Sequence, residues 1–278
     1  MHQIFKLSLK LKSGLLSELQ SDTIMGHFCW RLKEKSGVDK LKEFINLYHS
    51  GTPLFSVSNG LMEIFSDTSI KEEPDKKLLL FPKPLLSSPF EIKSSSKKER
   101  IENFLKYKDL KNRRLISLEQ LNLFINGKIE EYEKSCESDE NKISFPGLKE
   151  DLRVSVQIDR NSFASEEGKL FSYHPKYADD KTLLSILIKV YDEEKFAEFG
   201  CEELLKTVFE TGFGKKKSSG YGHFEVASYD EFTGIQEPDN PDGFITLGNY
   251  LKAESDNVTD GFYDYNVKYG RMGEDYSS

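Results

Sequence analysis

The chain has 278 residues and a formal net charge of −8, with 37% hydrophobic and 31% charged residues. No apolar run approaches the roughly 18 to 20 residues of a membrane-spanning helix, and residues 1–12 lack the continuous apolar stretch of a signal peptide. We therefore expect a cytoplasmic protein without membrane association. The length is typical of one large domain or of two packed units of about 100 to 150 residues each.

The cysteines and histidines give no sign of a metal site. The three cysteines are far apart and include no Cys-x-x-Cys pair, and the five histidines show no metal-ligand spacing. An odd number of distant cysteines also argues against a disulfide framework. We therefore expect no metal and no other cofactor.

The charges are distributed unevenly along the chain. Residues 225–278 contain twelve acidic and three basic residues, whereas residues 92–115 contain nine basic and three acidic residues. The basic segment is interpreted either as a surface along a nucleic-acid strand or as a solvated helix face. An acidic protein can therefore still present a basic face to a polyanion.

The first 65 residues predict a strand, a helix and two short strands. Apolar and polar residues alternate over residues 5–11, as in a strand with one buried face. Apolar residues then recur at helical spacing from Ser21 to Gly51, with Ser21 or Asp22 as the helix cap. Residues 54–57 and 61–65 predict strands around a hairpin-like turn.

Residues 66–150 differ in composition and are predicted to be an insertion. They are rich in lysine, glutamate and serine, with a helix expected at 118–132 and a mobile loop at 135–141. Regular secondary structure is expected again in residues 151–230. Residues 231–278 form an acidic tail whose position in the fold the sequence pattern does not predict. The segments 1–65 and 151–230 each resemble a ferredoxin-like unit, so we predict an α+β fold with two such halves.

The second half is predicted to contain three strands, a helix and a last strand. The strands are expected at 154–158, at 170–171 and at 183–191, and the nearly unbroken apolar run of the third favours a central strand. A helix is expected at 193–211, and Phe224 marks the last strand.

A glycine-rich loop separates that helix from the last strand. It contains four glycines in eleven residues, together with three consecutive lysines: Gly212, Phe213, Gly214, Lys215, Lys216, Lys217, Ser218, Ser219, Gly220, Tyr221 and Gly222. Glycines allow close approach of a ligand, and amides, hydroxyls and ammonium groups bind phosphate. The loop lacks the spacing of a P-loop and follows a helix, which disfavours mononucleotide chemistry. The alternative interpretation is a solvated turn without a ligand.

The arrangement Gly-x-Gly, basic spacer, Gly-x-Gly before a strand resembles the RAMP superfamily of CRISPR effector proteins. Within it, the chain is most similar to the handle-binding subunits of type III-A (Csm) complexes. Three further stretches are similar in order and position: Ser21-Asp22-Thr23-Ile24-Met25-Gly26, Phe81-Pro82-Lys83-Pro84-Leu85 and residues 153–160. The family usually has another glycine-containing strand near the C-terminus, and Asp275-Tyr276-Ser277-Ser278 supplies none.

The resemblance implies a noncatalytic subunit that binds the 5′ repeat-derived handle of crRNA and caps the backbone filament in RNA-guided antiviral defence. The implied partners are crRNA, the large polymerase-like cyclase subunit and an adjacent RAMP backbone subunit, with target RNA contacted indirectly. The inserted segment 66–150 would separate the handle from the guide sequence, as a thumb-like arm. The implied RNA-binding residues are Gly212, Gly214, Lys215, Lys216, Lys217, Ser218, Ser219, Gly220, Tyr221, Gly222, Ser21, Thr23, Gly26, His27, Arg153 and Arg160.

Several of these residues also have a purely structural interpretation. Ser21 can simply cap the helix, and Gly26 can allow a tight contact with a neighbouring strand. Arg160 can form a surface salt bridge instead of reaching a phosphate or base with Asp159 orienting it. Tyr221 can pack in the core rather than stack on a base. The sequence leaves these alternatives open.

The sequence offers little for catalysis. RAMP relatives that process the precursor transcript often use a histidine near the first helix as general base, and His27 is the candidate. It lies in a mostly apolar stretch without a partner acid, so packing or RNA contact is the preferred interpretation. Asp22 is better explained as a helix cap than as a catalytic aspartate. We expect no catalytic residue; the alternatives are a metal-independent endoribonuclease and a protein-only adaptor with an acidic partner.

Overall fold

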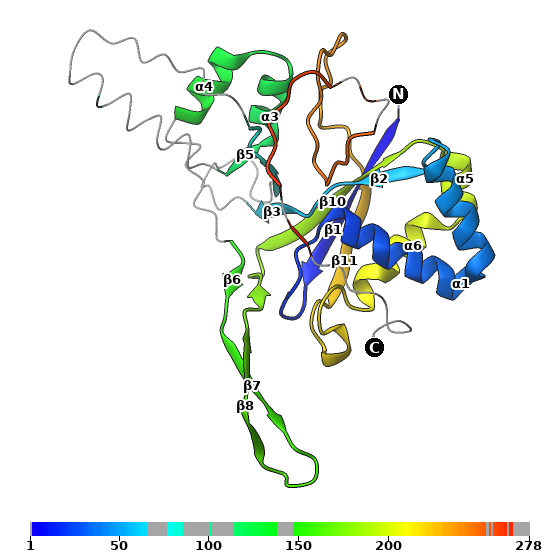
Figure 1. The fold of residues 1–278 in the computed structure, drawn as a ribbon. Coiled ribbons are helices and arrows are strands. Elements are labelled where there is room, and N and C mark those ends of the chain that lie inside the picture. Colours follow the sequence, from blue (N-terminus) through cyan, green and yellow to red (C-terminus); the bar gives the residue numbers. More distant parts are fainter. Residues whose placement is uncertain are drawn as a thin grey trace.

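A seven-stranded antiparallel sheet forms the centre of the computed structural model (Figure 1), which describes residues 2–65, 77–85, 101, 114–137, 147–253, 256, 258–265 and 267–268. The strand order is β11-β1-β10-β3-β4-β5, and β2 also pairs with β10. The strands are β1 (Gln3–Leu11), β2 (Phe55–Val57), β3 (Leu61–Phe65), β4 (Lys77–Pro82), β5 (Leu115–Ser117), β10 (Thr182–Val190) and β11 (Phe224–Glu231). The prediction of an α+β fold is confirmed.

Strands from both ends of the chain interleave in this sheet. The N-terminal β1 lies between β10 and β11, with Leu7 opposite Ile186 on one side and Tyr229 on the other. Together with the helices α1 (Ser21–His49) and α6 (Cys201–Glu210), these strands follow the β-α-β-β-α-β order of one ferredoxin-like unit. Strands of residues 1–65 thus share one sheet with β10 and β11 of residues 151–230, and two separate ferredoxin-like halves are not confirmed.

The predicted hairpin around Ser58-Asn59-Gly60 is wrong, although both of its strands exist. Neither strand pairs with the other: β2 pairs with one end of β10 and β3 with the other end. The Ser58 N–H donates to the Leu187 carbonyl, and the Asn59 N–H donates to the Leu247 carbonyl. The central strand β10, rather than the local turn, therefore satisfies the backbone groups of both strands.

One hydrophobic core lies between the sheet and the helices α1, α5 (Glu193–Glu198) and α6. On α1, Ile24, Phe28 and Leu32 recur at helical spacing and are fully buried. The second half of α1 follows a kink at Gly37, whose φ of +85° is outside the helical region. The predicted helix 193–211 is divided into α5 and α6 by Gly200, which also has a positive φ of 62°.

A second, smaller core covers the opposite face of the sheet near β4 and β5. It joins Leu79, Phe81 and Leu187 to the helices α3 (Leu118–Ile125) and α4 (Ile129–Glu137). Leu187 points to this face because successive side chains of β10 alternate between the two faces. The described parts of the predicted insertion, 77–85 and 114–137, therefore belong to the main body.

The single helix predicted at 118–132 is two helices. Ser117 begins α3 with a capping box to Gln120, and the chain turns at Asn126-Gly127 before α4. Residues 135–137, predicted as loop, are the end of α4, and residues 138–141 lie outside the described residues. Most of the basic segment 92–115 also lies outside the described residues.

A long hairpin, β7 (Arg153–Ile158) and β8 (Ser165–Tyr173), projects from the body (Figure 1). The two short strands β6 (Lys149–Glu150) and β9 (Lys176–Tyr177) pair at its base. The strands predicted at 154–158 and 170–171 are thus real but lie outside the central sheet. Their apolar side chains are exposed instead of buried: Val154, Val156, Ile158, Leu170 and Phe171.

The C-terminal segment packs back onto the body. Phe232, Ile235 and Leu247 contact the second core, so the first part of the predicted acidic tail is a packed segment. None of the helices in the described ranges combines the length and the apolar character that crossing a bilayer requires.

Candidate nucleic-acid interface

The four predicted glycines give the loop a shape that other residues would distort. Gly212, Gly214, Gly220 and Gly222 all have positive φ values. A Cβ on Gly222 would lie 2.0 Å from the Phe213 carbonyl oxygen, and a Cβ on Gly214 would lie 2.4 Å from the Ser17 Cβ. Backbone conformation and close approach therefore both require glycine in this loop.

The loop is anchored to the body through a buried side chain and backbone hydrogen bonds. The Phe213 ring is fully buried, and its N–H donates to the Gly222 carbonyl at 2.8 Å. The Gly222 N–H donates to the Gly14 carbonyl at 2.9 Å, and the Lys215 N–H donates to Ser17 Oγ at 2.9 Å. The interpretation as a loosely solvated turn does not fit this anchoring.

Most amides of the loop are already engaged within the protein. The N–H groups of residues 212–215 and 219–222 all donate to protein acceptors. These amides, predicted to contact phosphate, are therefore occupied by acceptors of the protein itself. In this structure an anion would instead meet the side chains of Lys215, Lys216 and Lys217, which are all exposed residues.

His27 on α1 contacts the loop at Gly214 and Phe213. Its Nε2 accepts the Gly214 N–H at 3.2 Å, and its ring packs 4.9 Å from the Phe213 ring. Burial, together with the charges of Lys217 and Arg31, lowers the pKa of His27 to about 4. His27 is therefore neutral at pH 7 and uses its Nε2 lone pair to hold the loop.

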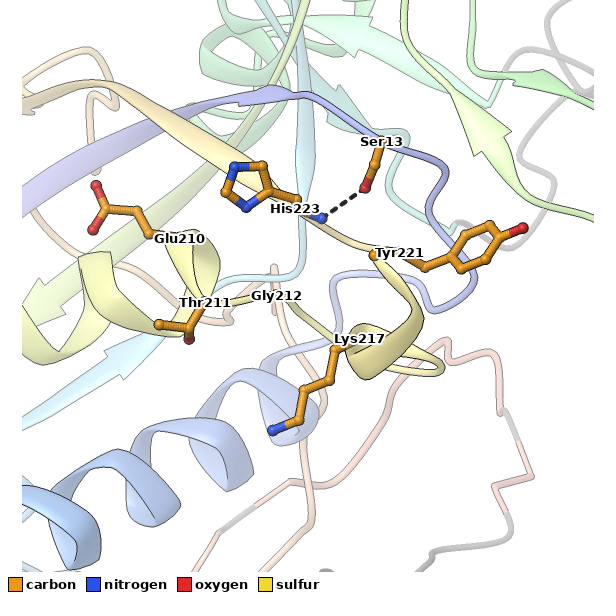
Figure 2. A pocket seen from close by; sticks show the side chains of 8 residues that line it. Ser13, Glu210, Thr211, Gly212, Lys217, Tyr221 and His223 are labelled. Atoms are coloured by element: carbon orange, nitrogen blue, oxygen red, sulfur yellow. Dashed lines mark hydrogen bonds between the residues drawn. The ribbon is translucent and has the colours of Figure 1, made fainter.

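An open depression of about 300 Å³ lies beside the loop, between the end of α6 and the start of β11 (Figure 2). Lys217 extends along it toward α1, whereas the Tyr221 ring points away at its rim. The His223 N–H donates to Ser13 Oγ at 2.9 Å and closes one side. The lining combines hydroxyl, cationic and acidic groups: Ser13, Glu210, Thr211, Gly212, Lys217, Gly220, Tyr221 and His223.

The root of the β7–β8 hairpin meets the other side of the loop. Lys216 Nζ lies 3.7 Å from the centroid of the Tyr173 ring and 4.9 Å from that of Phe171. The Tyr221 ring stands perpendicular to Tyr173 at 5.9 Å. Hydrogen bonding to Ser155, and then to Lys216, lowers the pKa of Tyr173. Phe171 and Tyr173 were not among the predicted site residues. Their only signal was the i, i+2 spacing of two aromatic residues, one in the strand predicted at 170–171 and one just after it.

The two predicted arginines are at opposite ends of this hairpin. Arg153 begins β7 near the loop and pairs with Asp151 at 3.0 Å. Arg160 follows the far end of β7, roughly 20 Å away at about 3.3 Å per residue. Asp159 accepts from the Asn161 N–H and from the Ser162 hydroxyl, so it shapes the hairpin turn rather than orienting Arg160.

The start of α1 is covered by the C-terminal segment. The helix begins after Gln20, whose side chain makes no capping hydrogen bond, and the Ser21 N–H donates to Asn59 Oδ1 at 2.8 Å, so the prediction that Ser21 or Asp22 caps the helix is wrong. Ser21 is buried, and its Oγ accepts the Asn249 N–H at 2.8 Å. Lys268 Nζ donates to both carboxylate oxygens of Asp22, at 2.6 and 2.8 Å, and to Thr23 Oγ1 at 2.9 Å.

Gly26, by contrast, faces open space. A Cβ added there would meet no atom within 4 Å, and the residue is exposed. The interpretation as a tight contact with a neighbouring strand is therefore wrong. Contact of Gly26 with RNA stays a prediction.

The described residues contain no cluster of three or more His, Cys, Asp or Glu side chains that could hold a metal ion. No model of a protein family and no curated protein matches the sequence.

Solved structures do resemble this chain. A chain of a Csm1–Csm4 cassette in complex with pppApA matches with a TM-score of 0.53 and 14% identity, covering 85% of this chain and 72% of that one. The same cassette in complex with cA4 gives a TM-score of 0.54 with the same identity and coverage. A chain of a Csm3–Csm4 subcomplex of the type III-A interference complex gives 0.50 and 14% identity, covering 83% of this chain and 70% of that one.

Csm4 is the subunit that these complexes have in common. At 14% identity the likeness concerns the fold alone, and at that level it confirms the expected resemblance to a subunit of type III-A (Csm) complexes.

Proposed function

We propose that this chain is a noncatalytic subunit of a type III-A CRISPR effector complex. It binds the 5′ repeat-derived handle of crRNA and caps the backbone filament. A Csm1-like cyclase subunit and a Csm3-like backbone subunit are its neighbours, since the solved structures of similar fold are complexes with Csm1 and with Csm3.

The anchored glycine-rich loop is the observation that carries this proposal. Its backbone is fixed by close approaches at Gly214 and Gly222 and by the buried Phe213. Three consecutive lysines extend from this fixed turn, beside a depression and the exposed hairpin. A preorganised cationic turn next to aromatic side chains suits a single-stranded RNA backbone, because ammonium groups bind phosphates and rings stack on bases.

The state of His27 supports a binding role over a cleaving one. A histidine with a pKa of about 4 is a weak base at neutral pH, and its acceptor nitrogen is occupied by the Gly214 N–H. His27 therefore suits loop support better than abstraction of a proton from a 2′-hydroxyl.

The test is RNA binding by the purified protein as a function of salt. A fluorescein-labelled RNA with the 5′ handle of the source organism's repeat is titrated by anisotropy at several salt concentrations. Changing Lys215, Lys216 and Lys217 to alanine should weaken binding and flatten the slope of log K against log salt by up to about 2, at about 0.7 per phosphate contact. The control changes Lys42 and Lys195, exposed lysines of α1 and α5, and should keep the wild-type slope.

Two outcomes contradict the proposal. Unchanged handle binding by the triple alanine variant would show that the loop is not the interface. Cleavage of repeat RNA in EDTA by the protein alone, abolished by His27→Ala, would establish the endoribonuclease instead. Crosslinking to labelled crRNA followed by peptide mapping gives an independent location of the contact.

A further inference from the structure

Lys216 differs from the two lysines beside it in its backbone conformation. Its φ of +57° is in the left-handed region, which costs a non-glycine residue about 1 to 2 kcal/mol. Its carbonyl oxygen accepts the Ser219 N–H at 2.9 Å and the Tyr221 N–H at 3.3 Å. A strained conformation persists only where surrounding contacts fix it.

That conformation directs the Lys216 side chain toward the hairpin. Nζ lies 3.7 Å from the Tyr173 centroid and 4.9 Å from the Phe171 centroid, within the range of cation–π attraction. The Tyr173 hydroxyl lies 2.8 Å from Ser155 Oγ, so the ring under Lys216 is itself tied to β7. The ammonium group is thus seated on rings of another element, although the residue as a whole is exposed.

The base of the hairpin is held by the β6–β9 pair and by the bridge from Leu15 to Lys176, and Lys216 adds a contact where the longer strands begin. A two-stranded hairpin is marginally stable by itself in water. Register pairs Arg153 with Tyr173 and Ser155 with Phe171, so these four side chains share the face toward the loop. The other face, with Val154, Val156 and Leu170, is exposed. The contact of Lys216 with Tyr173 therefore joins the loop to the hairpin root.

We propose that Lys216 is a positioning residue that clamps the root of the β7–β8 hairpin to the glycine-rich loop through its cation–π contact with Tyr173. Loop and hairpin then meet a single RNA strand as one unit. Lys216 contributes to affinity through this orientation, whereas Lys215 and Lys217 contact phosphate. The RNA part of this inference rests on the proposed function; the clamp itself does not.

The experiment compares Lys216→Met with Lys215→Met, which removes a neighbouring charge from the same loop. Amide hydrogen exchange of peptides from β7–β8 is measured in the full chain without RNA. Loss of one cation–π contact should speed exchange at the hairpin root about two- to fivefold in Lys216→Met and leave it unchanged in Lys215→Met. Lys216→Arg should restore the wild-type rate because a guanidinium also stacks on aromatic rings.

A Lys216→Gly variant separates the clamp from general destabilisation. Glycine relieves the left-handed strain at this position, so the fold should keep its stability while the hairpin root still exchanges faster. RNA titrations with the labelled handle should give weaker binding with an unchanged salt slope for Lys216→Met, and a flatter slope for Lys215→Met.

Unchanged hairpin exchange in Lys216→Met would overturn the clamp. So would a loss of salt slope in Lys216→Met equal to that in Lys215→Met, since that is the behaviour of a phosphate contact. If the wild-type protein does not bind the handle, the proposed function fails. Hydrogen exchange at the hairpin root still decides for or against the clamp in that case.

Discussion

Two glycines of the loop share a backbone conformation but differ in the space around them. Gly220 and Gly222 have φ values of 83° and 68°. A Cβ on Gly222 would overlap the Phe213 carbonyl oxygen at 2.0 Å, whereas one on Gly220 would meet no atom within 4 Å. The pair therefore separates the cost of backbone strain from the cost of a steric clash.

Substitution by alanine should reveal this difference. Gly220→Ala should reduce the free energy of unfolding by about 1 to 2 kcal/mol, the cost of the left-handed conformation alone. Gly222→Ala should cost about 3 kcal/mol or more, because the loop must also move away from Phe213. Urea denaturation of both variants measures the difference, and equal losses would contradict the close approach at Gly222.

His27 makes the stability of the protein depend on pH. Its pKa is lowered from 6.5 to about 4 by burial and by nearby cations. Between these values the unfolded chain binds a proton that the folded chain excludes, so the contribution of His27 favours folding above pH 6.5 and is lost as the pH falls toward 4.

Denaturation at pH 7 and pH 5 of the wild type and of His27→Gln tests this contribution. The wild type should lose about 2 kcal/mol more than the variant over this range, at 1.36 kcal/mol per pKa unit. The glutamine keeps an acceptor for the Gly214 N–H, so the comparison isolates titration of the ring. Parallel loss in both proteins would show that His27 is not buried in its neutral form.

At the scale of elements, α1 has an exposed glycine without a structural reason. Gly26 lies inside a helix, with open space where a Cβ would be. Glycine in a helix interior costs up to about 1 kcal/mol relative to alanine. A residue that weakens the helix and contacts nothing fits a place where an external molecule comes close.

Gly26→Ala should therefore stabilise the protein and weaken RNA binding at the same time. The free energy of unfolding should rise by up to about 1 kcal/mol, whereas handle affinity measured by anisotropy should fall because the methyl group occupies the approach path. If handle affinity stays at the wild-type value in the stabilised variant, Gly26 does not contact RNA.

At the scale of the whole molecule, the C-terminal segment covers the start of α1. Asn249 and Lys268 contact Ser21, Asp22 and Thr23, of which Ser21 and Thr23 are predicted RNA-binding residues. Burial raises the pKa of Asp22, and the Lys268 and Thr23 hydrogen bonds more than offset it, so the net pKa is lowered. RNA and the C-terminal segment therefore compete for this helix end if both use it.

Truncation after Gly248 should strengthen handle binding. It keeps Leu247 in the second core and removes six acidic and three basic residues along with the contacts to Ser21 and Thr23. Lys268→Met is the milder variant, which should uncover Thr23 and Asp22 and leave the contact of Asn249 with Ser21 in place. Anisotropy compares both with the wild type, and equal affinities in all three proteins would mean that RNA does not use the start of α1.

Much of the fold was predictable where a single segment carries its own pattern. The alternation in residues 5–11 identified β1, and the apolar run at 183–191 identified β10 as central. Alternating residues indicate a strand with one buried face, and a continuous apolar run indicates a strand buried on both faces. The clustering of glycine and lysine identified the loop that projects from the body beside α1. Its positive φ values follow directly from glycine content.

Contacts between distant segments were not predictable in this way. Local pattern cannot tell which strand satisfies β2 and β3, and both pair with β10, whose partner residues are 118 to 135 positions further along the chain. The same holds for Lys216 on Tyr173 and for Lys268 on Asp22. The sequence by itself determined which segments bury apolar surface and where the backbone must turn, because these depend on neighbouring residues. Only the tertiary structure decided which side chains of distant segments contact one another, because those contacts depend on how the whole chain folds.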